Sequence, residues 1–180
     1  GDLVKSFDVK NQKLVNSKVI KVFCHSCEEM GEYYLVINDN IRVTPNHPFY
    51  VNDKWLPAGE IKTGDLLLNI NGDAVRVVSV QKIFEQHRTF NLEVEGCHNY
   101  FAEDVLVHNK QQTCSNTCPN TCSSTCSTCN TNCGQSTCNC FIAGTKITMA
   151  DGSLKNIEDV EIGDFVKTFN ETANEIVDGR

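Results

Sequence analysis

Residues 66–78 read Leu-Leu-Leu-Asn-Ile-Asn-Gly-Asp-Ala-Val-Arg-Val-Val, two apolar runs separated by an Asn-Gly pair. Such runs predict β-strands, and Asn-Gly supplies the positive φ values of a type I′ turn between them. Residues 33–43 repeat the pattern around an Asn-Asp-Asn turn, and residues 150–153, Ala-Asp-Gly-Ser, interrupt a third apolar run. Short strands separated by turn signals predict an all-β fold. Single helical turns are expected at residues 57–60 and 155–158, and no long helix.

Two internal repeats organise the chain. Residues 1–18 recur without a gap as residues 163–180, beginning with Gly-Asp-Leu-Val-Lys-Ser-Phe against Gly-Asp-Phe-Val-Lys-Thr-Phe. These copies would compete for the same strands, so we expect one to be displaced or to pair with a second molecule in a strand-swapped dimer. Residues 60–66 resemble residues 159–165 more weakly. Two similar half-units in one domain predict an approximate two-fold axis.

The composition argues against two classes of partner. The chain of 180 residues has a formal net charge of −7 and no cluster of Lys and Arg, so no nucleic-acid partner is expected. No apolar run has the length of a membrane span, so no membrane association is expected. The chain begins with Gly and has no signal-peptide pattern, which indicates a piece of a longer polypeptide.

Residues 110–139 form a cysteine-rich segment that contains no aliphatic residue. Such a segment cannot build a hydrophobic core, so only disulfides or a metal would order it. Its Cys-x3-Cys spacing favours disulfides in an oxidising, extracellular compartment over a zinc site, where Cys-x2-Cys pairs recur. A disordered spacer is the third alternative. Seven of the eleven cysteines lie here: Cys114, Cys118, Cys122, Cys126, Cys129, Cys133 and Cys138.

Reactive side chains stand at both borders of this segment. Cys140 follows it directly, and His108-Asn109 precedes it. A thiol at one border and a His-Asn pair at the other are the groups needed to cut a chain at two places. If the order is changed so that residues 140–180 precede residues 1–109, Cys140 becomes the first residue and Asn109 the last of one continuous unit. A permuted chain or a window from a tandem array would have this order.

Four short blocks, read in that joined order, resemble the successive signature blocks of the Hint superfamily. This group contains inteins, bacterial intein-like domains and the Hint modules of secreted polymorphic toxins. The blocks are Cys-Phe-Ile-Ala-Gly-Thr at residues 140–145, Thr-Pro-Asn-His-Pro-Phe at 44–49, His-Asn-Tyr-Phe at 98–101 and Val-His-Asn at 107–109.

The resemblance covers residues 1–109 and 140–180, and only the cysteine-rich segment falls outside it. It implies an all-β horseshoe with internal pseudo-two-fold symmetry, plus an irregular cysteine-rich segment. Residues 1–109 would be the C-terminal portion of a Hint domain and residues 140–180 its N-terminal portion, with residues 110–139 as linker or cargo. It also implies a domain that processes its own flanking sequences once, by cleavage or splicing, without a cofactor or a metal.

At the first border, the resemblance assigns the nucleophile to Cys140. Its thiol would attack the carbonyl of Asn139 and convert the Asn139–Cys140 amide into a thioester. His47 is the candidate acid that protonates the leaving nitrogen, and Thr44 is the candidate residue that holds the strained carbonyl.

At the second border, the side-chain amide of Asn109 would attack its own carbonyl, form a succinimide and release Lys110. His108 is placed to polarise that carbonyl, and His98 to assist proton transfer. Two positions depart from the family pattern. Lys110 stands where many inteins have Ser, Thr or Cys to accept the acyl group, so cleavage is expected rather than ligation. Asn91 stands where inteins often have Asp, which removes a possible acid.

Rival interpretations give the same residues structural roles. In one, the chain is a secreted, disulfide-rich structural or binding protein with a degenerate Hint scaffold. In another, it is a cysteine hydrolase of other proteins, although the helix context of such a nucleophile is missing. Cys24 and Cys27, with Cys97 and His98, could bind an inhibitory zinc ion; a local disulfide or free thiols are the favoured alternatives.

Overall fold

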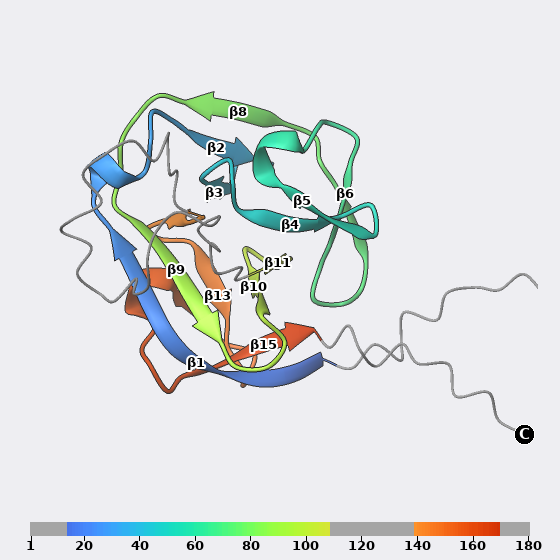
Figure 1. The fold of residues 1–180 in the computed structure, drawn as a ribbon. Helices are drawn as coiled ribbons and strands as arrows, with labels where there is room; N and C mark the ends of the chain where they lie inside the picture. Colours follow the sequence, from blue (N-terminus) through green and yellow to red (C-terminus); the bar gives the residue numbers. More distant parts are fainter. Residues whose placement is uncertain (1–13, 109–138, 170–180) are drawn as a thin grey trace, which may run out of the picture.

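The computed structural model describes residues 14–108 and 139–169, which form two curled antiparallel sheets (Figure 1). One sheet has the strand order β15-β1-β9-β12-β3-β2-β8. The other has the order β14-β13-β10-β11-β4-β6-β7, with β5 paired to β4. The all-β prediction is therefore confirmed. The predictions for the cysteine-rich segment fall almost entirely outside the described residues.

Apart from β1, which has 12 residues, the strands are short, as the turn spacing predicted. Their bounds are β1 Leu14–His25, β2 Tyr34–Ile37, β3 Ile41–Val43, β4 Pro48–Val51, β5 Lys54–Pro57, β6 Leu66–Leu68, β7 Ala74–Arg76, β8 Val80–Ile83, β9 Thr89–Val94, β10 Asn99–Ala102, β11 Val105–His108, β12 Phe141–Ile142, β13 Lys146–Thr148, β14 Leu154–Asn156 and β15 Phe165–Phe169. Within the described ranges the only helical pieces are three 3-10 turns: η2 Cys27–Glu29, η3 Ala58–Glu60 and η4 Ile157–Asp159. η3 and η4 lie where helical turns were predicted, whereas η2 was not predicted. No helix in these ranges is long and apolar enough to cross a membrane.

The hairpin between β6 and β7 forms at the predicted place but with a different turn. Gly72 has a φ of 82°, whereas Asn71 is not among the residues with positive φ, so the predicted type I′ turn on Asn71-Gly72 is wrong. The Asn69 side chain accepts hydrogen bonds from the backbone N–H groups of Asn71 at 3.0 Å and Asp73 at 2.8 Å. These two bonds stabilise a turn longer than the two-residue Asn-Gly turn, and Gly72 supplies its positive φ. Residues 149–153 share only the backbone bonds of this turn: the Met149 N–H donates to the Ser153 carbonyl at 2.9 Å and the Gly152 N–H to the Met149 carbonyl at 3.0 Å, with Gly152 at a φ of 87°.

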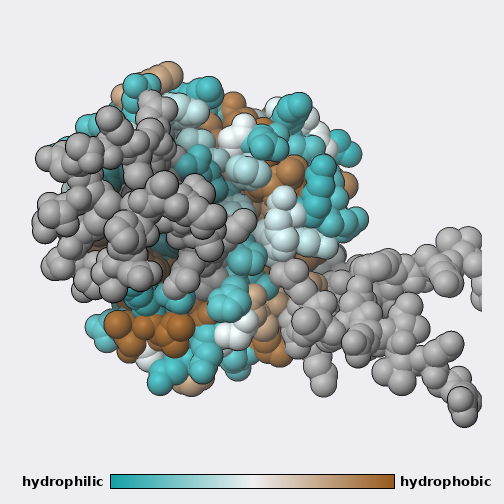
Figure 2. Space-filling view, viewed as in Figure 1, coloured by the Kyte–Doolittle hydropathy of each residue, from teal (hydrophilic) through white to brown (hydrophobic). Residues whose placement is uncertain are grey.

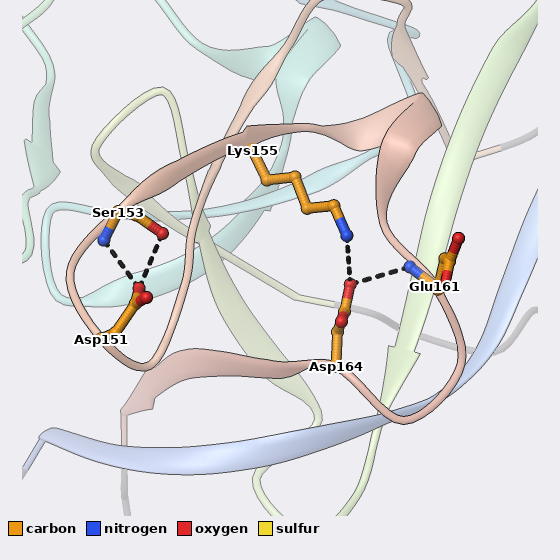
Figure 3. Close-up of polar contacts among 5 residues, drawn as sticks. All are labelled: Asp151, Ser153, Lys155, Glu161 and Asp164. Carbon is orange, nitrogen blue, oxygen red and sulfur yellow. Dashed lines mark hydrogen bonds and ion pairs between the residues drawn. The ribbon is translucent and has the colours of Figure 1, made fainter.

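The two half-units repeat one local structure, as the weaker sequence echo predicted. Asp164 accepts hydrogen bonds from the Glu161 N–H at 2.9 Å and the Lys155 ammonium at 2.8 Å, and both contacts lower the pKa of Asp164 (Figure 3). Asp65 accepts the corresponding bond from the Lys62 N–H at 2.8 Å. Gly64 and Gly163, which precede these aspartates, both have a φ of 101°.

The long sequence repeat is described only in part, so the expected competition between its copies stays a prediction. Residues 14–18, from the first copy, pair with β15, from the second, in register from Leu14 with Phe169 to Lys18 with Phe165. In Figure 1, β1 and β15 lie side by side at one edge of the molecule. The described parts of the copies are therefore partners in one sheet. Residues 1–13 and 170–180 lie outside the described ranges.

The core is formed by the inward-facing residues of both sheets. Buried side chains from β3, β4, β10, β11 and β12 meet in one cluster that includes Phe49, Tyr100, Val107 and Phe141. The strands from residues 14–108 and 140–169 contribute to it together, so both described segments build one domain. Figure 2 shows apolar patches between hydrophilic regions on one face. The large apolar residues exposed in the described ranges are Leu14, Ile20, Leu66, Val78, Phe84, Leu154, Ile162 and Phe165.

Candidate active site

Cys140 lies in the middle of the first sheet. Its side chain is 1% exposed, and it directly precedes β12. Phe141, the first residue of β12, is paired with Val43 of β3 on one side and with Phe90 of β9 on the other. Because β12 has a neighbouring strand on each side, the backbone after Cys140 is held in place by the sheet. The predicted proximity of residues 140–162 to residues 33–51 is confirmed.

Thr44 binds the peptide groups on both sides of Cys140. Its hydroxyl oxygen accepts a hydrogen bond from the backbone N–H of Cys140 at 2.8 Å. The same hydroxyl donates to the Cys140 carbonyl at 3.1 Å, and the Thr44 N–H donates to that carbonyl at 2.9 Å. The motif predicts that Thr44 holds the carbonyl of Asn139. These contacts lie on the nitrogen side of the Asn139–Cys140 amide.

The turn that carries Thr44 and His47 is clamped from the neighbouring 3-10 turn. The His47 N–H donates to the carbonyl of Thr44 at 3.2 Å, which closes the turn. The carbonyl of His47 accepts from the Ala58 N–H at 2.8 Å, and the Gly59 N–H donates to the carbonyl of Pro45 at 2.7 Å. η3 therefore sets the position of the His47 ring through the backbone.

The His47 ring is fully buried and electrically neutral. Its centroid lies 4.3 Å from that of Phe141, and neither ring nitrogen has a hydrogen-bond partner in the described part of the chain. Burial lowers the pKa of His47 to about 3; the carbonyl of Asn139 opposes this shift, and the charge of a protonated His108 adds to it. The Asn139 carbonyl is thus near the ring without completing a hydrogen bond. A neutral imidazole offers one N–H donor and one nitrogen acceptor.

His108 brings the second border to the same place. It ends β11, where it is half-buried and paired with Asn99 of β10. Its ring lies edge-on to Trp55 with centroids 4.9 Å apart. β11 pairs with β4, with Val107 opposite Phe49, so the end of β11 at His108 lies beside the start of β4, just after His47. Asn109 itself lies outside the described residues.

His98 is exposed in a turn with a φ of 53°, directly before Asn99, the β10 residue that pairs with His108. The residue after it, Asn99, is buried. The Asn99 side chain donates to the carbonyl of Phe169 at 2.8 Å and accepts from its N–H at 2.7 Å, so it joins the two chain segments. The role of His98 in proton transfer stays a prediction.

Near Cys140, Tyr100 had no role assigned from the sequence, and Asn91 was noted there only as a departure from the family pattern. The buried hydroxyl of Tyr100 donates to the side-chain oxygen of Asn91 at 2.9 Å. Burial, with the nearby Cys140 thiol as a second cause, raises the pKa of Tyr100 well above its ordinary value. A tyrosine hydroxyl in the buried strand Asn-Tyr-Phe-Ala at residues 99–102 is the sequence signal that could have found it.

The proposed zinc ligands do not gather in the described residues. Cys24, Cys27 and Cys97 are free thiols, and the Arg88 guanidinium donates to the Cys24 sulfur at 3.3 Å. Residues 14–108 and 139–169 contain no group of three or more His, Cys, Asp or Glu side chains that could hold a metal ion.

A family model described as the pretoxin HINT domain matches residues 1–110. The chain belongs to this family. The HINT match covers the segment that carries Thr44, His47, His98, His108 and Asn109, and it ends before Cys140. No curated protein matches the chain.

Solved structures similar to this HINT chain include inteins and an intein-like domain. The bacterial intein-like domain from Clostridium thermocellum is 24% identical, with 57% of this chain and 85% of that chain covered and a TM-score of 0.45. The gp41-1 intein is 21% identical over 52% of this chain and 73% of that chain, with a TM-score of 0.43. A DnaB intein from Synechocystis sp. PCC 6803 is 25% identical over 51% and 67%, with a TM-score of 0.42.

Proposed function

We propose that this HINT domain cuts its own chain at both borders of the cysteine-rich segment. The observation that carries the proposal is the convergence of Cys140, Thr44 and His47 on the Asn139–Cys140 amide, whose N–H is bound by the Thr44 hydroxyl at 2.8 Å. Residues 140–180 then act as the N-terminal portion of the domain and residues 1–109 as its C-terminal portion. The order along this chain is permuted relative to the joined unit.

At the first border the proton moves from sulfur to nitrogen. The neutral His47 ring accepts the thiol proton, and the Cys140 sulfur bonds to the carbonyl carbon of Asn139. The carbon–nitrogen bond then breaks as the imidazolium returns the proton to the Cys140 nitrogen. The products are a thioester and a free amine, so the step is an isomerisation with no external reactant. The low pKa of His47 favours return of the proton to nitrogen.

At the second border, the side-chain nitrogen of Asn109 attacks its own carbonyl carbon. The bond to Lys110 breaks, the proton lost by the side-chain nitrogen is transferred to the leaving amine, and a succinimide remains. His108 assists by donating to the carbonyl oxygen, and His98 is the proposed proton carrier. Attack of water on the thioester completes the release of residues 110–139 as a linear peptide.

A cyclic product is the alternative to this linear peptide. The new α-amine of Lys110 can attack the thioester at Asn139, because one folded domain holds both borders at a high effective concentration. Lys110 has no acyl-accepting side chain, so the linear form is expected to predominate. The cyclic form is lighter by one water. Intact-mass measurement of the released peptide separates the two.

Single substitutions at each border test the function. Asn109→Ala is expected to abolish release of Lys110, and Cys140→Ala to abolish only the thiol-induced cut at Asn139–Cys140. Intact mass with and without dithiothreitol reads both events, and Cys97→Ala serves as the control for loss of a free thiol. The assignment is wrong if both variants cut at both borders like the parent. A chain that never cuts would favour the disulfide-rich structural protein instead.

A further inference from the structure

Asn91 lies across the sheet from Cys140. β12 pairs with β9 with Phe141 opposite Phe90 and Ile142 opposite Thr89. Continuing this antiparallel register by one residue places Cys140 opposite Asn91. Residues opposite each other on antiparallel strands project to the same face and have Cβ atoms about 5 Å apart. The side chain of Asn91 is therefore the neighbour of the Cys140 thiol on the β9 side.

The carboxamide of Asn91 has a defined orientation. Its oxygen accepts hydrogen bonds from the backbone N–H of Leu92 at 2.8 Å and from the Tyr100 hydroxyl at 2.9 Å. A backbone N–H can only donate, so the atom that it contacts must be the oxygen and not the nitrogen. Both acceptor positions of the oxygen are then occupied. What remains of the amide is its NH₂ group, which can only donate.

We propose that Tyr100 is a positioning residue. Its hydroxyl fixes the Asn91 carboxamide so that the NH₂ group of Asn91 donates a hydrogen bond to the Cys140 sulfur. This role rests on the proposed function of Cys140 as the nucleophile. A donor next to the sulfur stabilises the thiolate, which is the attacking form. An aspartate at position 91 would instead place a negative charge beside the thiolate and oppose its formation. In this chain the Asn91–Tyr100 pair thus favours the thiolate where a carboxylate would not.

The Tyr100 side chain is well placed for this role. It is fully buried on β10, and its ring lies 6.5 Å from that of Phe141, the residue after Cys140. Its raised pKa keeps the hydroxyl protonated, so it donates to Asn91 at every working pH. Among the described residues, His47, in the turn after β3, and His108, on β11, are further titratable groups near this site.

Titration of the Cys140 thiol tests the proposal independently of cleavage. The full chain is labelled with [3-¹³C]cysteine in an Asn109→Ala background, and the signal lost in Cys140→Ala is followed against pH. Tyr100→Phe removes only the hydroxyl and is expected to raise the thiol midpoint by about one pH unit, the equivalent of one hydrogen bond. Asn91→Leu is expected to raise it at least as far. The matched control, Tyr33→Phe, removes a hydroxyl elsewhere and should leave the midpoint unchanged.

The double variant distinguishes action through Asn91 from a direct effect. In the Asn91→Leu background, Tyr100→Phe should cause no further shift. Additive shifts, or an unchanged midpoint in Tyr100→Phe, would overturn the positioning role. Failure of the proposed function would give a different result, namely a parent chain that titrates normally at Cys140 yet yields no thiol-induced cleavage.

Discussion

At the scale of single residues, the buried neutral state of His47 makes stability depend on pH. Its folded pKa of about 3 lies below the ordinary value of 6.5, so between these values the unfolded chain binds a proton that the folded chain does not. Stability therefore falls as the pH drops below 6.5. Between pH 7 and pH 5 the loss from His47 is about 2 kcal/mol. Urea denaturation at both pH values should show a smaller loss for His47→Gln; equal losses would contradict the prediction.

The Thr44 hydroxyl has a separate, testable contribution. Thr44→Val keeps the shape but leaves the buried N–H of Cys140 without its acceptor, which should destabilise the fold by about 1–3 kcal/mol. The thiol-induced cut should also slow at least tenfold, because the leaving nitrogen loses its orientation. Thr44→Ser retains the hydroxyl and should keep most of the rate. Quantified cleavage time courses check this order, and a Val variant as fast as the Ser variant would rule it out.

At the scale of the elements, the contact between η3 and the turn before β4 sets the geometry of the site. A Cβ atom added at Gly59 would lie 3.2 Å from the Pro45 carbonyl oxygen and 3.3 Å from its Cβ, so the turn must shift. We expect Gly59→Ala to slow the cut at Asn139–Cys140 severalfold and to cost about 1 kcal/mol of stability. Glu60→Ala, at the exposed neighbouring position, is the control. Parent-like cleavage by the Gly59 variant would show that η3 does not position His47.

Local sequence patterns predicted the elements better than their contacts. The strands on both sides of Gly72 follow from apolar runs, and the η3 and η4 turns follow from their local sequences. The type of turn at Gly72 did not follow from the Asn-Gly pair, because the side chain of Asn69, which lies outside that pair, selects it. The motifs predicted that Thr44 and Cys140 meet. The Asn91–Tyr100 contact depends on sheet order and register, which no local pattern specifies.

At the scale of the whole molecule, the repeat leaves a choice of partner for residues 14–18. Residues 3–7 carry nearly the sequence of β15, which occupies this position in the described fold. We propose that residues 3–7 of one chain can take this position in a second chain and the reverse, which gives a strand-swapped dimer. Deletion of residues 1–13 is expected to abolish a concentration-dependent dimer in light scattering. A dimer that survives the deletion would have another origin.

The contacts between residues 14–108 and residues 140–169 determine what remains of the domain after both cuts. β12 lies between β3 and β9, β15 pairs with β1, and β13 pairs with β10. Residues 140–169 are therefore hydrogen-bonded to strands of residues 14–108 at three places. Side chains join the two segments as well. The hydroxyls of Ser17 and Thr168 form a buried hydrogen bond of 3.0 Å, and the Asn99 side chain is hydrogen-bonded to Phe169. Severing both covalent links to the cysteine-rich peptide therefore leaves two polypeptides interleaved as one particle. The spent domain should persist as a tight heterodimer of its own fragments, separable only by denaturant.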